Sequence, residues 1–346
     1  MPPVSTQDVV ALYSRYPYPS PVVAEGLAFD IANLFSLLCG DDDLIGRTVL
    51  DAGCGTGQRV VGFAQRYPLA RVHGMDAAQA SLTVAGELAR RHGVNNVTFS
   101  RQDIMNLEMD ETFDFIISTG VVHCLEDPRR GLRNLCRHLA PGGVICIWLY
   151  HPFGEMDRLL GRELLLTLWG ENRGDLAEGQ RMMEQLRLRL NPSHYGAGAD
   201  AAPAESRRGR LSADVDAFMH PIVNAYRFGE AMALFRDTGV DWVAVNGINT
   251  PESMKLVDLE GVEEAGREFC LRDVDLFPTD DLRERFNALS RVERLKTIEV
   301  MLKPTGFSIM AGRGDSLDRL LPRVAGNAVP AAALPQPDPR IFRVYG

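Results

Sequence analysis

Residues 48–58 read Thr48-Val49-Leu50-Asp51-Ala52-Gly53-Cys54-Gly55-Thr56-Gly57-Gln58. Three alternating glycines come directly after an apolar run. A second apolar run ends in Asp76, nineteen residues after the last glycine. Glycine is needed where a strand turns sharply into a helix and a ligand touches the backbone, because a Cβ atom would obstruct both. An acidic side chain at the end of the next strand can hold two ribose hydroxyls. The stretch therefore predicts a nucleoside-binding β-α-β unit.

The spacing of the glycines excludes the dinucleotide-binding fingerprint. The pattern G-x-G-x-x-G needs a glycine three residues after its second glycine. Counted from Gly55 that position is Gln58, and counted from Gly57 it is Val60. The ligand is therefore not expected to be a nicotinamide or flavin dinucleotide.

The glycine run resembles motif I of the class I S-adenosylmethionine-dependent methyltransferases, whose ligand has no pyrophosphate. The resemblance is closest to the subgroup with ubiquinone- and menaquinone-pathway methyltransferases, and it covers about residues 46–150. The further matches, in chain order, are Asp76, Asp103, residues 113–123 and residues 139–144. The resemblance implies an enzyme that uses S-adenosylmethionine and methylates a small molecule.

The resemblance also assigns cofactor contacts. Gly53, Gly55 and Gly57 are expected to border the amino-acid part of S-adenosylmethionine. Asp76 is expected to take its ribose hydroxyls, and Asp103 with Ile104 to meet the adenine. The alternative for either aspartate is a purely structural role, in which its side chain caps the helix that follows it. The remaining residues expected at the cofactor are Asp51, Cys54, Ala77, Thr119, Gly120 and, from the N-terminal segment, Tyr16.

From residue 48 to residue 150, apolar runs alternate with helical patterns, which predicts a Rossmann-like, doubly wound, mostly parallel α/β sheet covered on both faces. Asp51, Asp76, Asp103 and Thr119 then fall at the carboxyl ends of strands, where such folds bind ligands. Strands are predicted over 48–52, 72–76, 97–102, 113–118 and 143–150, with helices over 57–66, 78–92 and 128–139. Residues 241–246 and 307–311 are predicted to close the sheet as an antiparallel edge pair, with a helical excursion over 251–303.

The 346 residues exceed one average domain. We expect an N-terminal lid (1–45), the cofactor-binding core (46–152), a helical cap that chooses the substrate (153–240), the completion of the sheet (241–313) and an extended or partly disordered surface tail (314–346). Apolar stripes predict two amphipathic helices between residues 153 and 190, typical of a core or of a dimer surface.

The lid contains a helix over residues 5–14, capped by Ser5 or Thr6, followed by an aromatic, proline-rich stretch with Tyr13, Tyr16 and Tyr18. These tyrosines either pack against the core or close over the cofactor, where their rings can stabilise a sulfonium cation and exclude water.

Methyl transfer depends mainly on alignment, and a base helps only some acceptors. The candidates for a base or a substrate contact are His123, His151, His220 and the hydroxyl of Tyr18. Each histidine has a structural alternative as a buried or turn-fixing residue.

Forty-six acidic against 37 basic residues disfavour a nucleic-acid partner. The six cysteines form no C-x-x-C pair and no zinc-ligand spacing, so no metal is expected and most thiols should be buried and reduced. Without a signal peptide or an apolar run of about 18 residues, the protein is expected to be soluble, cytoplasmic and free of membrane, and a homodimer remains open. Two other functions remain open: an enzyme that cyclises S-adenosylmethionine itself, for example to azetidine-2-carboxylate with release of methylthioadenosine, and a sensor that binds the cofactor without catalysis.

Overall fold

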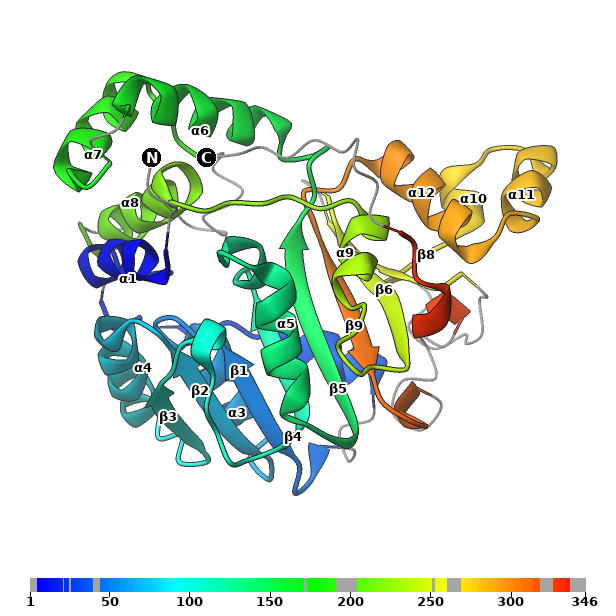
Figure 1. The fold of residues 1–346 in the computed structure, drawn as a ribbon, viewed down its shortest axis with the longest axis horizontal. Coiled ribbons are helices and arrows are strands. Elements are labelled where there is room, and N and C mark those ends of the chain that lie inside the picture. The colour runs from blue at the N-terminus through cyan, green and yellow to red at the C-terminus, as the bar shows by residue number, and fades with distance from the viewer. Residues whose placement is uncertain are drawn as a thin grey trace.

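A mixed β-sheet runs through the molecule (Figure 1). The structure, a computed structural model, describes residues 5–20, 22–24, 26–39, 44–170, 173–190, 204–250, 253–259, 269–317 and 326–336. Within them the sheet has ten strands in the order β3-β2-β1-β4-β5-β9-β6-β7-β8, and β10 pairs with β6. The parallel part consists of β1 (Thr48–Ala52), β2 (Arg71–Asp76), β3 (Val97–Arg101), β4 (Phe113–Thr119) and β5 (Leu139–Tyr150).

Helices cover both faces of this sheet because its strands alternate buried apolar side chains between the two sides. In β4, for example, Ile116 packs into one core and Phe115 into the other. One face is covered by α2 (Asp30–Leu38), α3 (Gln58–Arg66) and α4 (Gln79–Arg91). The other is covered by α5 (Pro128–Arg137), α9 (Phe228–Leu234) and α12 (Arg291–Leu302). The predicted doubly wound α/β fold is confirmed.

The predicted antiparallel strands are β6 (Trp242–Asn249) and β9 (Gly306–Gly312), which pair with each other, and β9 also pairs with β5. The sheet continues beyond them. Within the predicted helical excursion, β7 (Met254–Val257) and β8 (Cys270–Leu271) extend the sheet before α10 (Asp273–Leu276), α11 (Asp280–Asn287) and α12. The excursion is therefore only partly helical, because β7 satisfies backbone groups that the edge of β6 would otherwise leave unpaired.

The C-terminal segment is another difference from expectation. In residues 326–336, β10 (Val329–Pro330) pairs with β6, and the side chain of Leu334 is buried, with a short 3₁₀ helix η8 (Ala331–Ala333) between them. Pro330, Ala332, Ala333 and Gln336 are exposed, but residues 326–329 and Leu334 are buried, and for these the prediction of a surface tail is wrong. Small apolar side chains and one strand pair bury them, which composition alone does not indicate.

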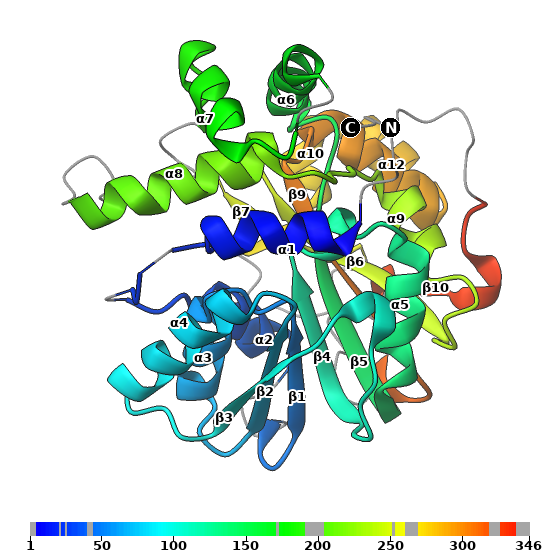
Figure 2. The same ribbon diagram turned by 60° about the vertical axis from the view of Figure 1, so that its left-hand side comes forward.

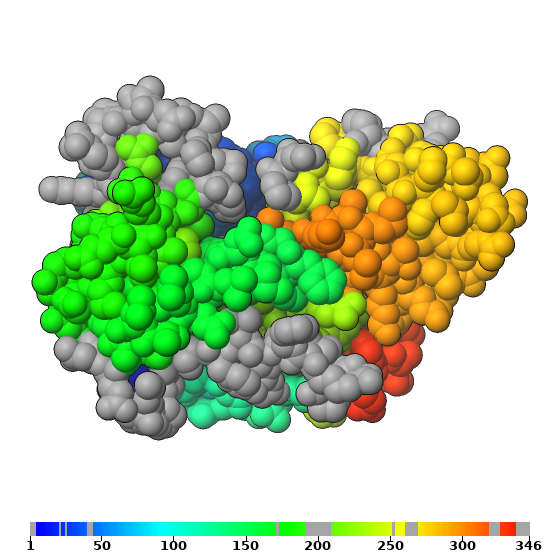
Figure 3. Space-filling model, turned by 90° about the horizontal axis from the view of Figure 1, so that it is seen from above, coloured from blue at the N-terminus to red at the C-terminus, as the bar shows by residue number. Residues whose placement is uncertain are grey.

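Above the carboxyl ends of the parallel strands lies a cap of helices (Figures 1 and 2). It contains α6 (Met156–Trp169), α7 (Leu176–Gln185) and α8 (Ala204–Met219), and it has a core of its own. The N-terminal helix α1 (Thr6–Arg15) lies between cap and sheet and contributes Leu12 to the cap core. Figure 3, which looks down on this side, shows α6 and α7 in green on one side and α12 in orange on the other.

The apolar stripe of α6 is divided between two environments. Leu159 and Leu165 are buried, whereas Leu160 and Leu164 are about half exposed. Thus only part of the stripe forms core. No helix among the described residues is long and apolar enough to cross a lipid bilayer.

Candidate active site

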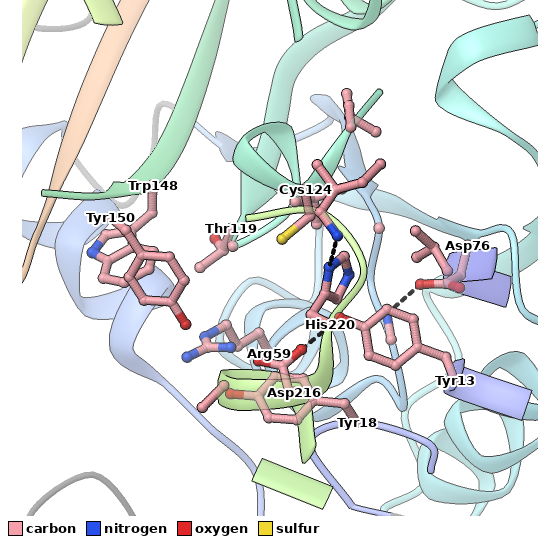
Figure 4. Close-up of a pocket in the computed structure, with 18 of the residues that line it drawn as sticks. Tyr13, Tyr18, Arg59, Asp76, Thr119, Cys124, Trp148, Tyr150, Asp216 and His220 are labelled. Carbon is pink, nitrogen blue, oxygen red and sulfur yellow. Dashed lines mark hydrogen bonds between the residues drawn. The ribbon is translucent and has the colours of Figure 1, made fainter. Parts of the chain in front are cut away.

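A cavity of about 460 Å³ lies between the carboxyl edge of the parallel strands, the cap and α1. This volume falls within the range of roughly 300 to 1,000 Å³ that small-molecule sites occupy. In Figure 4, Asp76 stands at one side of the cavity, and Trp148 and Tyr150 stand at the opposite side. The cavity thus has a glycine-loop end and an aromatic end.

At the first end, the three glycines of the loop have positive φ angles, of 84° at Gly53, 53° at Gly55 and 87° at Gly57. Gly53 and Gly55 line the cavity. Gly57 instead packs against α4, because a Cβ atom there would come within 2.7 Å of the Ala85 methyl. The first two glycines therefore shape the cavity wall, and the third allows close packing of α3 on α4.

Asp76 is the last residue of β2 and lies beside the glycine loop. Its Oδ2 accepts a hydrogen bond from the Gly55 amide at 2.9 Å, and its Oδ1 accepts one from the Ala78 amide at 2.8 Å. Burial raises the pKa of Asp76, while these amide donors act to lower it. Each oxygen keeps a lone pair beyond its amide bond, so the fixed carboxylate can still accept hydrogen bonds from two neighbouring hydroxyls.

Four other expected cofactor contacts also line the cavity: Ala77, Ile104, Thr119 and Gly120. Asp103 lines it as well, but its side chain is occupied by local bonds. Its Oδ1 accepts from the Met105 amide at 2.9 Å, and its Oδ2 accepts from Asn106 Nδ2 at 3.2 Å, which caps the short helix η2 (Ile104–Asn106). Asp103 therefore has a capping function, and Ile104 offers the apolar surface beside it.

Besides Gly57, three expected contacts do not reach the cavity. Asp51 and Cys54 are buried behind the loop, and burial raises the pKa of Asp51 to about 7. Tyr16 points into the cap core, where its hydroxyl donates to Gln180 Oε1 at 2.8 Å. Tyr16 is the non-helical residue that ends α1, so its side chain does not continue the face of Tyr13, which does line the cavity. The three closely spaced tyrosines therefore do not share one face.

The N-terminal segment is held at both ends of the cavity. The Tyr18 carbonyl oxygen accepts from the Thr56 amide at 3.0 Å, on the glycine loop. The Tyr13 hydroxyl donates to Asp216 Oδ1 at 2.6 Å, on α8 of the cap (Figure 4). The segment thus links the loop to the cap across the cavity, and the rings of Tyr13 and Tyr18 form part of its wall.

Two of the candidate histidines are enclosed away from the cavity. His123, in the 3₁₀ helix η3 (Val122–Cys124), lies with its ring 4.4 Å from the Tyr150 ring, and its backbone carbonyl accepts from Asn224. His151 Nε2 lies 3.1 Å from Glu299 Oε2, and both side chains are fully buried. Burial lowers the pKa of each histidine. Both positions therefore correspond to the structural alternative.

His220, at the end of α8, lines the cavity and is fully buried. Its Nδ1 accepts a hydrogen bond from the Ile222 amide at 3.1 Å, so in the neutral ring the proton resides on Nε2. Burial, assisted by Arg162 and Arg158, lowers the pKa of His220 to about 3. In this arrangement His220 is a neutral hydrogen-bond donor and not a base.

The sequence analysis did not single out Asp216, Arg158 or Tyr150, which all line the cavity. The Arg158 guanidinium forms an ion pair with Glu155 and lies 4.1 Å from the centre of the Tyr150 ring. A signal was present in α8, where the cavity-lining residues recur at helical spacing. They are Ala213, Asp216, Ala217 and His220.

The part of the chain that contains the glycine loop is similar to known proteins. A methyltransferase domain family matches residues 45–173. An uncharacterized protein of Synechococcus sp. is 30% identical over 332 residues, covering 90% of this chain and 73% of that protein. Trans-aconitate 2-methyltransferase of Deinococcus radiodurans is 38% identical, but over only 29% of this chain and 36% of its own length.

Among solved structures, PKMT2 from Rickettsia typhi matches with a TM-score of 0.50 and 14% identity, covering 91% of this chain and 54% of that one. At that identity the likeness concerns the fold alone. The chain thus spans about a third to a half of the length of these two named proteins.

Proposed function

Because this chain belongs to the class I S-adenosylmethionine-dependent methyltransferases, we propose that it methylates a small molecule held in the cap end of the cavity. The observation that carries this proposal is the division of one cavity into a glycine-loop end and an aromatic end. The first end suits a nucleoside, and the second leaves room for an acceptor beside it.

For the cofactor, we propose that Asp76 binds the ribose hydroxyls and that Ile104 packs against the adenine, with Asp103 fixing the turn that presents it. Gly53, Thr119 and Gly120 would border the amino-acid part. These residues fit the group, because Asp76 retains acceptor capacity on both oxygens. When bound, S-adenosylmethionine supplies a methyl carbon already activated by its sulfonium.

The acceptor is proposed to bind in the aromatic end of the cavity, here named the acceptor chamber. The ring of Tyr18 would form part of a lid that excludes water. His220 would donate a hydrogen bond from Nε2 to the acceptor. Neither is required as a base, since alignment alone can supply roughly 7 to 11 kcal/mol. The residues that define the chamber are Tyr13, Tyr18, Tyr150, Arg158, Asp216 and His220.

The cofactor assignment is tested by calorimetry with S-adenosylhomocysteine and with NAD. We expect S-adenosylhomocysteine to bind in the micromolar range and NAD not to bind. Asp76→Ala should weaken the first affinity about 10- to 100-fold, because hydrogen bonds to a charged group contribute about 1.5 to 3 kcal/mol. Asp110→Ala, at an exposed residue, is the control and should leave it unchanged. Preferential binding of NAD would refute the assignment.

The reaction is tested by incubating the protein with S-adenosylmethionine, alone and with acceptors, and identifying the products by mass spectrometry. Methyl transfer yields S-adenosylhomocysteine only when an acceptor is present. Methylthioadenosine formed from S-adenosylmethionine alone would instead show cyclisation, and tight binding without any product would show a sensor.

Two further expectations belong to the same proposal, no nucleic-acid partner and a cytoplasmic location, and a homodimer remains open. The formal net charge of −9 supports the first, because a nucleic-acid surface needs excess positive charge. Sedimentation velocity over a range of protein concentrations tests the homodimer.

A further inference from the structure

The acceptor chamber contains a carboxylate with an unused oxygen. Asp216 Oδ1 accepts the Tyr13 hydroxyl, and no described residue donates to its Oδ2 or forms an ion pair with it. The side chain is only partly buried although it lies deep in the molecule, so its remaining surface faces the cavity that it lines. A carboxylate in such surroundings is costly unless a positive group meets it.

Each of the two arginines that line the cavity has an acidic partner other than Asp216. Arg158 is paired with Glu155 and stacked on the Tyr150 ring. Arg59 is paired with Asp30 at 2.7 Å. These are the two basic residues among the described side chains that line the cavity, which also include six carboxylates: Asp30, Asp76, Asp103, Glu126, Glu155 and Asp216. The cavity as a whole therefore favours a cation.

The tyrosine, cysteine and histidine side chains around Asp216 are uncharged near neutral pH. Burial raises the pKa of Tyr18 to about 12 and also raises the pKa values of Tyr13 and Cys124. The pKa of His220, lowered to about 3, keeps that ring neutral. The positive charge of Arg158 acts to lower the pKa of Asp216, but its ion pair is with Glu155. Asp216 thus has no ion-pair partner of its own among the described residues, and it lies among tyrosine rings whose faces attract cations.

We propose that the acceptor is an amine, which enters as an ammonium ion and pairs with Oδ2 of Asp216. This inference rests on the proposed function, and it names the substrate class. Other polar acceptors, such as alcohols, bring no positive charge to the carboxylate, and a carboxylate acceptor would be repelled by it.

Asp216 then also accounts for the proton that must leave before transfer. The ammonium gives one proton to the carboxylate, which frees the nitrogen lone pair. The nitrogen–carbon bond to the methyl group forms as the carbon–sulfur bond breaks, and sulfur keeps that electron pair. The product leaves as a methylammonium ion, and the proton on Asp216 passes to water. Burial, which raises the pKa of Asp216, makes it a better proton acceptor than an exposed aspartate.

The test uses three probes of similar size and different charge: benzylamine, benzyl alcohol and phenylacetate. Their binding to the full-length protein saturated with S-adenosylhomocysteine is measured by ligand-observed NMR titration. We expect benzylamine to bind at least tenfold more tightly than benzyl alcohol. Asp216→Asn should reduce this preference to less than twofold while S-adenosylhomocysteine affinity stays within twofold. Asp157→Asn, which removes an exposed charge from α6, should keep the preference.

Tyr13→Phe separates the charge of Asp216 from its role in holding the N-terminal segment. This variant removes the hydroxyl bond and retains the carboxylate, so the preference for benzylamine should survive. Loss of the preference in Tyr13→Phe, its survival in Asp216→Asn, or equal binding of benzyl alcohol would overturn the proposal. Preferential binding of phenylacetate would overturn it too, by assigning the chamber to Arg158. Failure of S-adenosylhomocysteine to bind the unaltered protein would refute the proposed function instead.

Discussion

Gly55 shows how a single residue serves two parts of the site. A Cβ atom added there would lie 2.6 Å from the Tyr18 carbonyl oxygen, so the residue allows the N-terminal segment to approach the loop. Gly46, just before the amino end of β1, also has a positive φ, but nothing lies within 4 Å of a Cβ atom added there. A side chain at Gly46 would therefore cause backbone strain alone, whereas one at Gly55 would cause strain and a steric clash.

We expect Gly46→Ala to lose about 1 to 2 kcal/mol of unfolding free energy, because it places a side chain in the left-handed region. Gly55→Ala should lose more than that, because its Cβ also meets the Tyr18 carbonyl oxygen. Only Gly55→Ala should also lose turnover, by tenfold or more, since it displaces Tyr18. Urea unfolding and initial rates measure the two effects. Full turnover in a folded Gly55→Ala protein would show that the approach of Tyr18 is unimportant.

His220 predicts a pH dependence of stability. Its pKa is about 3 in the folded protein against about 6.5 when unfolded, so between these values the unfolded chain binds the proton and the folded chain does not. The contribution of His220 to the unfolding free energy is complete above pH 6.5, and below this pH it falls by about 1.4 kcal/mol per pH unit. Between pH 7.5 and pH 5, the unfolding free energy of the unaltered protein should therefore fall by about 2 kcal/mol more than that of His220→Asn. Urea midpoints of both proteins at each pH check this; parallel curves would contradict it.

Among the elements, the N-terminal segment carries the contact between the glycine loop and the cap. Its backbone is fixed at Tyr18 by the Thr56 amide, whereas the Tyr18 hydroxyl has no hydrogen-bond partner among the described residues. The ring, and not the hydroxyl, is thus the part with a visible role in the cavity wall.

Accordingly, Tyr18→Phe should turn over within about twofold of the unaltered protein, and Tyr18→Ala should lose catalytic rate more than cofactor affinity. The reason is that a lid matters most in the transition state, where water must be absent and the methyl group aligned. Single-turnover rates and S-adenosylhomocysteine affinities separate the two. A large loss in Tyr18→Phe would restore the hydroxyl as a catalytic group.

The whole molecule has three apolar cores, one on each face of the sheet and one in the cap. Residues 5–20 contribute to the cap core through Leu12 and Tyr16, which are 1% and 8% exposed, and not to either core of the sheet. Deleting residues 1–20 should therefore leave the sheet folded, as the sequence predicts, but loosen the cap.

Hydrogen exchange resolves this difference by region. Amides of β1, β4 and β5 should keep their protection in the truncated protein, whereas those of α6 and α8 should exchange at least tenfold faster, and turnover should collapse. A truncated protein with a protected cap and full activity would show that the segment is only surface packing.

The parts of the site that the sequence predicted are those made by neighbours along the chain. The strand, the glycine loop and Asp76 belong to one β-α-β unit, in which chirality and the short connection leave a single arrangement. The cavity-facing positions of Gly53, Gly55 and Asp76 follow from that unit alone. The order of β1 to β5 is equally local in origin, since each crossover brings a strand beside an earlier one.

By itself, then, the sequence determined the doubly wound core, its cofactor class and the cavity at the carboxyl ends of the strands. Tertiary structure decided which side chains meet there. Helical periodicity states which residues share a face, but not what that face meets, so Tyr16 turned to the cap core and Asp216 to the cavity. His123 and His151 follow strands whose ends are covered, and are enclosed instead of exposed. Contacts over a hundred residues or more, such as Tyr13 with Asp216, arise only when cap and sheet pack together, and no local pattern encodes them.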